Sequence, residues 1–132
     1  MIERIKVKTA KHTSVVNITQ RIREIVESSS VENGLCIVYV PHTTAAVFIN
    51  EGADPDVVKD ILNTLEKLVP WKNDYAHMEG NAAAHIKSSI IGNSRIVPIL
   101  EGRLMLGRWE AIFLAEFDGP REREVIVSIV RT

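Results

Sequence analysis

The chain has 132 residues, 45% of them apolar and 25% charged, with a formal net charge of −1. These values are typical of one globular domain with its own hydrophobic core, so we predict a single domain over residues 1–132. The balanced charge argues against a broad nucleic-acid-binding surface. No stretch approaches the roughly 20 apolar residues of a membrane-spanning helix, and the N-terminus lacks the apolar segment of a signal peptide. We therefore expect no nucleic-acid partner, no membrane and a cytoplasmic location.

The first third of the chain predicts two strands and a helix. Residues 1–7 and the segment around Val15 and Val16 have the character of short strands, which we expect to form a hairpin. Asn17 and Gln20 have the spacing of a capping box, which predicts that a helix begins there. The apolar stripe of this helix consists of Ile18, Ile22, Ile25 and Val26.

The middle third predicts two more strands and a second helix. Residues 35–40 form a continuous apolar run rich in β-branched residues, which is typical of a strand covered on both faces. Cys36 lies in this run, and as the only cysteine it has no internal disulfide partner, so we interpret it as a small core residue. A second strand follows over residues 44–49. Asp54 and Pro55 predict a helix start, and an apolar helical face continues to Leu68.

The last third predicts a short helix and several strands. After the polar segment 71–80, Asn81 can cap a helix through about Ile90, with Gly92 at its end. Four strand-like segments follow, at residues 96–100, 104–106, 109–117 and 124–130. The chain thus predicts an α+β domain with seven or eight strands in a largely antiparallel sheet, packed against about three helices.

A first polar cluster follows the apolar run 35–40. His42, Thr43 and Thr44 come directly after this strand, where a rigid scaffold often presents functional groups. Glu51, at the far end of the next strand, can serve as an acid/base group or orient a histidine. The alternative is a turn histidine bonded to local backbone.

A second cluster surrounds the start of the predicted third helix. His85 lies one turn after Asn81 on the same helical face, and His77 and Glu79 precede them on the loop. Both imidazoles can therefore meet near the positive helix terminus, which favours anions such as phosphate. The alternative for each histidine is a hydrogen-bonded structural residue.

A third cluster is a turn with two carboxylates followed by two arginines. Glu116 and Asp118 can hold Arg121 or Arg123 in place to bind a phosphate. The alternative is a charged turn with surface ion pairs. His12 lies on a polar edge outside these clusters, and we interpret Trp71 and Trp109 as core or interface residues.

Three neutral imidazoles can form a catalytic zinc-type site with an open coordination position. His42, His77 and His85 are the candidate ligands of a divalent metal such as zinc or magnesium. Their spacing matches no standard zinc motif, and the chain has no dinucleotide, P-loop or hydrolase-elbow motif.

In their order along the chain, these clusters resemble the YjbQ-like family, whose members are often labelled secondary thiamine-phosphate synthase. The matching segments are residues 41–46, 50–57, 77–85, 102–109 and 116–121. The resemblance implies a compact α+β fold, a homotrimer, and histidines gathered in a metal or anion site. It also implies a weak activity that joins an aminopyrimidine pyrophosphate to a thiazole phosphate. Where the family usually has Thr-Trp-Gln, this chain has Arg108, Trp109 and Glu110, which we expect to reshape a pocket rim or a subunit contact.

The sequence leaves three hypotheses for function. The first is an enzyme acting on a phosphorylated small molecule. Its catalytic residues would be His42, Glu51, His77, Asn81 and His85, with Thr43, Thr44, Arg121 and Glu116 binding the phosphate. The second is a metal-dependent phosphate-ester hydrolase, and the third is a non-catalytic trimeric module that binds a metabolite.

Overall fold

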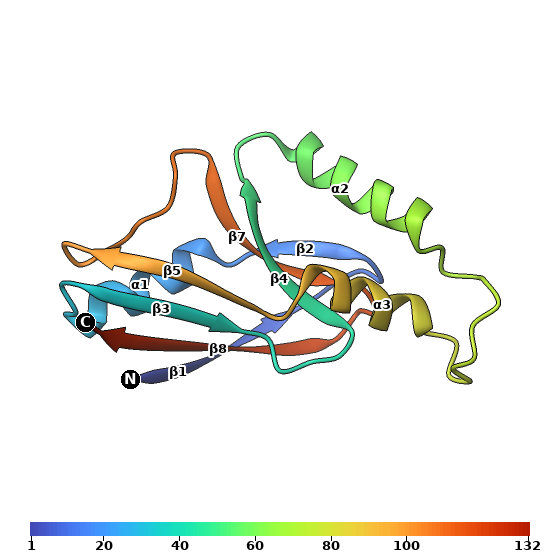
Figure 1. The fold of residues 1–132 in the computed structure, drawn as a ribbon, viewed down its shortest axis with the longest axis horizontal. Helices are drawn as coiled ribbons and strands as arrows, with labels where there is room; N and C mark the ends of the chain where they lie inside the picture. The colour runs from blue at the N-terminus through green and yellow to red at the C-terminus, as the bar shows by residue number, and fades with distance from the viewer.

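The computed structural model describes residues 1–132 as three helices and eight strands (Figure 1). The helices are α1 (Thr19–Ser29), α2 (Pro55–Leu68) and α3 (Ala82–Ile91). The strands are β1 (Ile2–Lys8), β2 (Ser14–Asn17), β3 (Gly34–Tyr39), β4 (Ala45–Glu51), β5 (Ser94–Leu100), β6 (Arg103–Leu104), β7 (Glu110–Glu116) and β8 (Glu122–Arg131). The predicted α+β class is confirmed, and every predicted helix and strand is present. None of the helices has the length and apolar character needed to cross a lipid bilayer.

The strands form two antiparallel sheets. One has the order β1-β8-β3-β5-β6 and the other the order β2-β7-β4. The predicted β1–β2 hairpin is wrong, because β1 pairs with β8 and β2 pairs with β7. Thr9 explains the crossing: its backbone amide donates to the Arg121 carbonyl at 2.8 Å, and its hydroxyl donates to Glu116 at 2.7 Å. The segment after β1 is thereby held at the β7–β8 turn and passes on to the second sheet.

The predicted capping box at the start of α1 is also wrong. The helix begins at Thr19, after the fully buried Ile18. Asn17 therefore lies outside the helix, where its Oδ1 accepts from the amide and the hydroxyl of Thr19 at 3.0 and 2.6 Å. The Gln20 amide reaches forward to Glu24 instead of back to Asn17. By contrast, Asp54 caps α2 as predicted, accepting from the Asp56 amide at 2.9 Å.

Two hydrophobic clusters divide the molecule into layers. The larger, of 19 buried residues, fills the space between the five-stranded sheet, α1 and one face of the three-stranded sheet. The smaller, of nine, lies between the other face of the three-stranded sheet and helices α2 and α3. Strand β4 is consequently covered on both faces, and neighbouring residues Ala45 and Ala46 are both fully buried.

Two-sided burial was predicted for residues 35–40, and this prediction is wrong. Cys36 and Val38 are fully buried, but Leu35 and Ile37 are only partly buried and Tyr39 is 41% exposed. The outer face of the five-stranded sheet has no covering layer within the chain. Cys36 is a core residue as predicted, and burial raises the pKa of its thiol to about 11.

Candidate functional site

One pocket brings the three predicted clusters together. It has a volume of about 480 Å³ and is lined by eleven residues, of which ten are polar or charged and the other is Pro41. We call it the histidine pocket. Its lining is Pro41, His42, Thr43, Thr44, His77, Glu79, Asn81, His85, Asp118, Arg121 and Arg123. Every predicted site residue is in this set except Glu51 and Glu116.

His42 lies just beyond the end of β3, and its ring orientation is fixed by the backbone. Its Nε2 is 2.9 Å from the Glu124 amide nitrogen, which can only donate, so Nε2 accepts and Nδ1 carries the proton. Burial lowers the pKa of His42 below its ordinary value, and the nearby Arg123 charge lowers it further. His42 is therefore a neutral imidazole that offers an N–H donor from Nδ1.

Behind His42 lies a buried ion pair between Glu116 and Arg123, which are 0% and 4% exposed. The guanidinium is bidentate: its Nε donates to Glu116 Oε1 at 2.8 Å, and one terminal nitrogen donates to Oε2. The same nitrogen donates to Thr44 Oγ1 at 2.9 Å. Glu116 does not line the pocket, so its place is behind Arg123 and not against a ligand.

The pKa of Glu116 combines opposed effects. Burial raises it, but hydrogen bonds from Arg123, the Thr9 hydroxyl and the Asp118 amide outweigh burial, so the pKa lies below its ordinary value. Glu116 is thus ionised at neutral pH. Because three groups donate to this carboxylate, and Arg123 in turn donates to Thr44, the wall of the pocket formed by the strands is held rigidly.

Arg121 forms the outer edge of the pocket. Its Nε donates to the Asp118 carbonyl at 2.8 Å and one terminal nitrogen donates to Asp118 Oδ2 at 3.1 Å, while the side chain stays 53% exposed. The Asn81 amide also donates to Asp118 Oδ2, at 2.9 Å. Burial raises the pKa of Asp118, but the hydrogen bonds from Asn81 and Arg121 bring it below its ordinary value.

Gly119 allows the turn after Asp118 to lie against the segment between β1 and β2. A Cβ at this position would be 2.3 Å from the Lys11 carbonyl oxygen. Only glycine permits this approach, in which the Gly119 amide donates to the His12 carbonyl at 3.0 Å.

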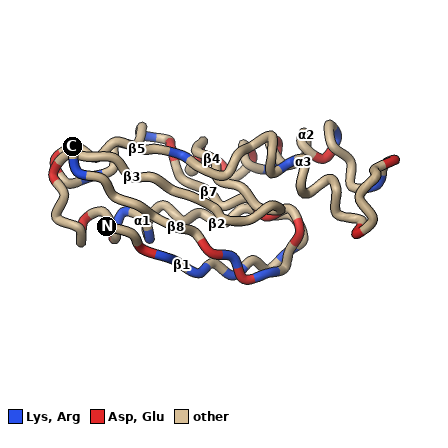
Figure 2. Tube along the Cα trace, turned by 60° about the horizontal axis from the view of Figure 1, so that its bottom comes forward, with Lys and Arg blue, Asp and Glu red and all other residues tan.

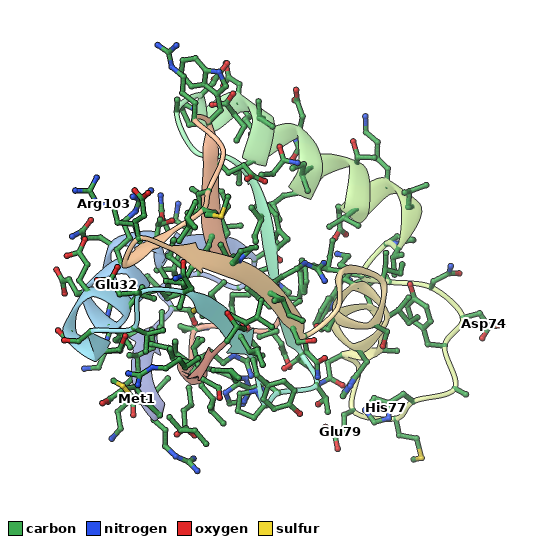
Figure 3. The ribbon with its side chains drawn as sticks, turned by 60° about the vertical axis from the view of Figure 1, so that its left-hand side comes forward. Met1, Glu32, Asp74, His77, Glu79 and Arg103 are labelled. Atoms are coloured by element: carbon green, nitrogen blue, oxygen red, sulfur yellow. The ribbon has the colours of Figure 1, made fainter.

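His77 and His85 form the wall of the pocket opposite Arg123, and their rings lie against each other. Their ring centroids are 5.2 Å apart with the planes at 82°, an edge-to-face arrangement. His77 Nε2 is 3.9 Å from Glu79 Oε2. Figure 3 shows His77 and Glu79 on the loop beside α3, far from Glu32 and Arg103. The sequence predicted this meeting of the two imidazoles near the start of the helix.

Asn81 precedes α3 as predicted, but its side chain does not cap the helix. The amide group turns to Asp118 instead, which leaves Asn81 Oδ1 buried without a hydrogen-bond partner. The positive end of α3 therefore borders the pocket without a side-chain cap.

Glu51 lies at the other end of β4 from His42. The seven-residue strand ends at Glu51 and spans about 20 Å from its first residue to its last, at roughly 3.3 Å per residue. Its Oε2 accepts from the amides of Ala53 and Asp54 at 2.9 and 3.1 Å, so it stabilises the loop before α2. The expectation that Glu51 joins the histidines is therefore wrong for this structure, because a seven-residue strand is too long for the two ends to meet.

Arg108 and Glu110 also lie away from the pocket. The Arg108 guanidinium stands 4.9 Å from the centre of the Trp109 ring, and Glu110 accepts from the Gly107 amide at 2.8 Å. Neither lines the histidine pocket, so an effect on its rim is not supported, while an effect on a subunit contact stays a prediction. Trp109 is 56% exposed and is not a core residue.

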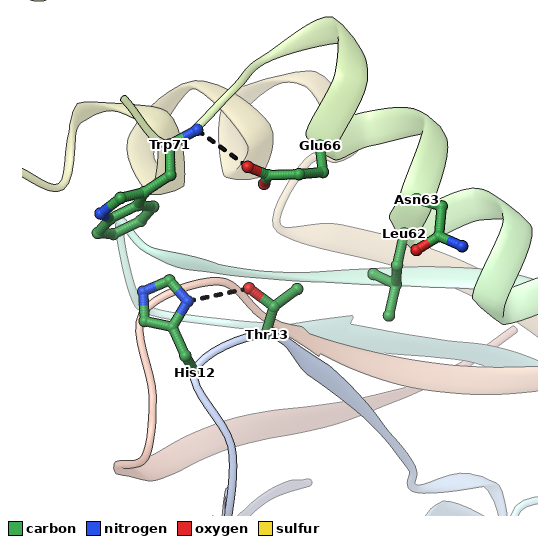
Figure 4. Close-up of a pocket in the computed structure, with 6 residues that line it drawn as sticks. All are labelled: His12, Thr13, Leu62, Asn63, Glu66 and Trp71. Carbon is green, nitrogen blue, oxygen red and sulfur yellow. Dashed lines mark hydrogen bonds between the residues drawn. The ribbon is translucent and has the colours of Figure 1, made fainter. Parts of the chain in front are cut away.

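His12 lines a separate pocket of about 570 Å³ beneath α2 (Figure 4). Its ring meets Trp71 edge-on with centroids 4.3 Å apart, and its Nε2 is 3.8 Å from Asp118 Oδ1. The sequence does not place His12 in the site, because nothing in its local pattern indicates the contact with Asp118. Trp71 packs against the smaller hydrophobic cluster, as predicted for a core residue.

The three histidines do not fit a three-imidazole metal site in this arrangement. Nε2 of His42 is used by the Glu124 amide and Nδ1 carries the proton, so this ring has no free lone pair for a metal. No group of three or more His, Cys, Asp or Glu side chains has a geometry that could hold a metal ion.

The chain was compared with known proteins. The family model described as "UPF0047 protein YjbQ-like" matches residues 3–132. The UPF0047 protein MJ1081 of Methanocaldococcus jannaschii is 47% identical over 98% of this chain and 94% of its own length. UPF0047 protein YugU of Bacillus subtilis is 41% identical, over 98% and 99%.

Solved structures agree with these matches. A YjbQ/UPF0047 family protein of Clostridium acetobutylicum has a TM-score of 0.95 and 45% identity, covering 97% of this chain and 99% of its own. A protein of unknown function from Sulfolobus solfataricus has a TM-score of 0.96 and 36% identity, covering 100% and 97%. The resemblance seen in the sequence is thus confirmed over nearly the full length. The chain belongs to the YjbQ-like UPF0047 family.

Proposed function

We propose that the chain is an enzyme that acts on a phosphorylated small molecule in the histidine pocket. The observation that carries this proposal is a pocket lined by ten polar or charged residues and one proline, in a chain that is 45% apolar. Two guanidinium groups, three imidazoles and two threonines converge there from three distant segments. Such a set suits a ligand with several anionic oxygens.

The geometry gives each residue of the pocket a separate role. Arg121 and the uncapped end of α3 attract the phosphate, and His42 donates from Nδ1 to one of its oxygens. Asp118 holds the Arg121 guanidinium in place from behind. His85 lines the same pocket and can donate a further hydrogen bond to the phosphate.

In its finer form, the proposal is that the enzyme resembles secondary thiamine-phosphate synthase and acts in the cytoplasm. The thiazole nitrogen would form a bond to the methylene carbon of the aminopyrimidine as the carbon–oxygen bond to pyrophosphate breaks. Pyrophosphate would leave with the electron pair, and Arg121 and His42 would stabilise its charge. The family resemblance supports this substrate pair, and the polar lining supports a pyrophosphate leaving group.

Purified protein incubated with both precursors tests this reaction, with and without added divalent metal. We expect thiamine phosphate from the wild type and at least a tenfold lower rate for His85→Ala. Glu51→Gln is the matched control, because Glu51 lies about 20 Å away by strand length. Absence of product in every condition would contradict the finer proposal.

Two other functions have their own tests. A metabolite-binding module would bind phosphate through the same residues without turnover. A metal-dependent hydrolase would lose activity with a chelator and contain metal when purified, but the state of the His42 ring gives it less support.

We also propose that the chain assembles as a homotrimer through the outer face of the five-stranded sheet. Strand β3 carries no charged residue (Figure 2), and Ile37 lies opposite Ile96, which is 60% exposed. A continuous apolar surface of this kind is typical of a subunit interface. We expect Ile96→Lys to yield monomers in light scattering and Leu68→Lys, at an exposed position on α2, to stay trimeric. A monomeric wild type would contradict this assembly.

A further inference from the structure

The hydroxyl of Thr9 joins the two ends of the turn that carries Asp118 and Arg121. Thr9 follows β1 directly and is 6% exposed. Its Oγ1 lies 2.7 Å from Glu116 Oε1, at the end of β7, and 2.9 Å from the amide nitrogen of Arg121, just before β8. One buried oxygen atom, from the opposite end of the chain, therefore connects both ends of the turn.

The direction of each hydrogen bond is fixed by the partner of the hydroxyl. The Glu116 carboxylate is ionised and only accepts, so it receives the hydroxyl hydrogen of Thr9. The Arg121 amide only donates, so the hydroxyl oxygen accepts from it. The Arg121 carbonyl receives the backbone amide of Thr9 instead, at 2.8 Å. A hydroxyl fits this place because it donates and accepts through one atom, which a hydrocarbon side chain cannot do.

The middle of the turn lies against the same two residues. A Cβ at Gly119 would be 3.0 Å from the Thr9 hydroxyl oxygen and 2.8 Å from Cγ of Glu116. The Asp118 amide donates to Oε2 of Glu116 at 3.0 Å. The Glu116 carboxylate and the Thr9 hydroxyl therefore hold the backbone of the turn at its middle and at its far end.

The position of the turn decides where Arg121 presents its charge. The Nε of its guanidinium donates to the Asp118 carbonyl at 2.8 Å, and a terminal nitrogen donates to Asp118 Oδ2 at 3.1 Å. Both acceptors belong to the turn itself. The guanidinium therefore moves with the turn, and whatever holds the turn also holds this charge at the edge of the histidine pocket.

We infer that Thr9 is a positioning residue for ligand binding, whose hydroxyl holds the turn so that the Arg121 guanidinium meets the phosphate. This inference rests on the proposed function, in which a phosphorylated molecule occupies the histidine pocket. Thr9 does not line that pocket, so it acts through Arg121 and not by touching the ligand. Without the hydroxyl, the turn gains freedom that phosphate binding must remove again, and affinity falls.

The test compares three variants in calorimetric titrations with inorganic phosphate. Thr9→Val keeps the shape of the side chain but removes the hydroxyl, whereas Thr9→Ser keeps the hydroxyl. Thr13→Val is the matched control, because the Thr13 hydroxyl lies in the same segment but contacts the His12 ring. We expect the dissociation constant to rise at least fivefold in Thr9→Val and less than twofold in the other two. Equal affinity in Thr9→Val and the wild type would overturn the inference.

A double variant separates positioning from a general loss of structure. In an Arg121→Met background, Thr9→Val should change phosphate affinity less than twofold, because the group that it positions is absent. A fivefold loss in that background as well would overturn the inference, since Thr9 would then act on the pocket by a route other than Arg121.

Arginine side-chain NMR reports on the guanidinium in the absence of a ligand. The Nε–H of Arg121, which donates to the Asp118 carbonyl, should exchange with solvent at least threefold faster in Thr9→Val than in the wild type or Thr9→Ser. Failure of phosphate to bind to the wild type, with this faster exchange in Thr9→Val, would overturn the proposed function and leave Thr9 as the residue that positions Arg121.

The wild type alone gives a test if Thr9→Val does not fold. Saturating phosphate should slow hydrogen exchange of the Arg121 backbone amide, which donates to the Thr9 hydroxyl, at least threefold. The Thr13 amide should exchange at its ligand-free rate. Unchanged exchange at Arg121, with phosphate bound, would overturn the inference and leave the proposed function in place.

Discussion

The two walls of the histidine pocket are built in different ways. The wall from β7, β8 and the end of β3 holds Glu116 and Arg123 fully or nearly buried, with a bidentate ion pair and a histidine whose tautomer is fixed. The wall from α3 and the loop before it holds His77, which is 42% exposed and has one ionic neighbour at 3.9 Å. The strand wall is fixed before a ligand arrives, whereas the loop of the other wall, which carries His77, has few contacts to restrain it.

This difference assigns separate roles to the two walls. Groups that stabilise developing charge work best when they are already in place, and the strand wall meets this condition. Groups that move to enclose a ligand need weak local restraints, and the loop that carries His77 is weakly restrained. Substitutions on the strand wall should therefore affect folding, while substitutions on the helix wall should affect binding.

The largest effect is expected when the buried pair loses one partner. Arg123→Met leaves Glu116 buried without its counter-ion, which should lower the free energy of unfolding by about 3–5 kcal/mol. Urea denaturation measures this loss. Arg121→Met is the matched control, since the Arg121–Asp118 pair is half-exposed and should contribute less than about 1 kcal/mol.

A second measurement separates charge burial from lost packing. The double variant Glu116→Leu with Arg123→Met removes both charges and should recover part of the stability lost by Arg123→Met alone. If Arg123→Met costs no more than Arg121→Met, the strand wall is not the rigid half of the pocket.

The helix wall should respond to substitution in the opposite way. His85→Ala should weaken phosphate binding about tenfold, or about 1.4 kcal/mol, because it removes a lining donor without leaving a buried charge. Its unfolding midpoint in urea should stay close to that of the wild type. Calorimetric titration with phosphate measures the affinity, and a destabilised variant with unchanged affinity would reverse the roles of the two walls.

A pH series tests whether His42 is neutral in the folded protein. Burial and Arg123 lower the pKa of His42 below 6.5, its value in an unfolded chain, so the unfolded state binds the proton more tightly. The contribution of neutral His42 to the free energy of unfolding should therefore be fully present above pH 6.5. It should be lost as the pH falls below 6.5 towards and through the pKa of His42 in the folded state. His42→Gln should lessen this fall, although it weakens the contact with the Glu124 amide at every pH. Parallel curves for the two proteins between pH 5 and 8 would contradict a neutral His42.

The sequence predicted the helix wall better than the strand wall. Asn81 and His85 are one helical turn apart, so local spacing alone indicates that they share a face, and the structure places both in the pocket. The partnership of Thr9 with Glu116, 107 positions away, arises only because the segment after β1 crosses to the second sheet. No local pattern encodes such a contact.

The same reasoning explains the errors in the fold. The apolar run 35–40 shows that a strand forms, but not which of its faces is covered, and the strands covered on both faces are β4 and β7. The closeness of β1 and β2 in sequence predicts that they pair as a hairpin. In the structure, β1 pairs instead with β8, at the other end of the chain.

The smallest effect is expected at Glu51, which the sequence placed among the catalytic groups. Glu51→Ala removes an acceptor from two exposed loop amides, so it should cost about 1 kcal/mol or less of unfolding free energy. Phosphate affinity and the chemical shifts of the pocket histidines should stay at their wild-type values. A loss of affinity comparable to that of His85→Ala would mean that the far end of β4 is coupled to the pocket. The rigid part of the site would then include the whole of β4 and not only the strand wall of the pocket.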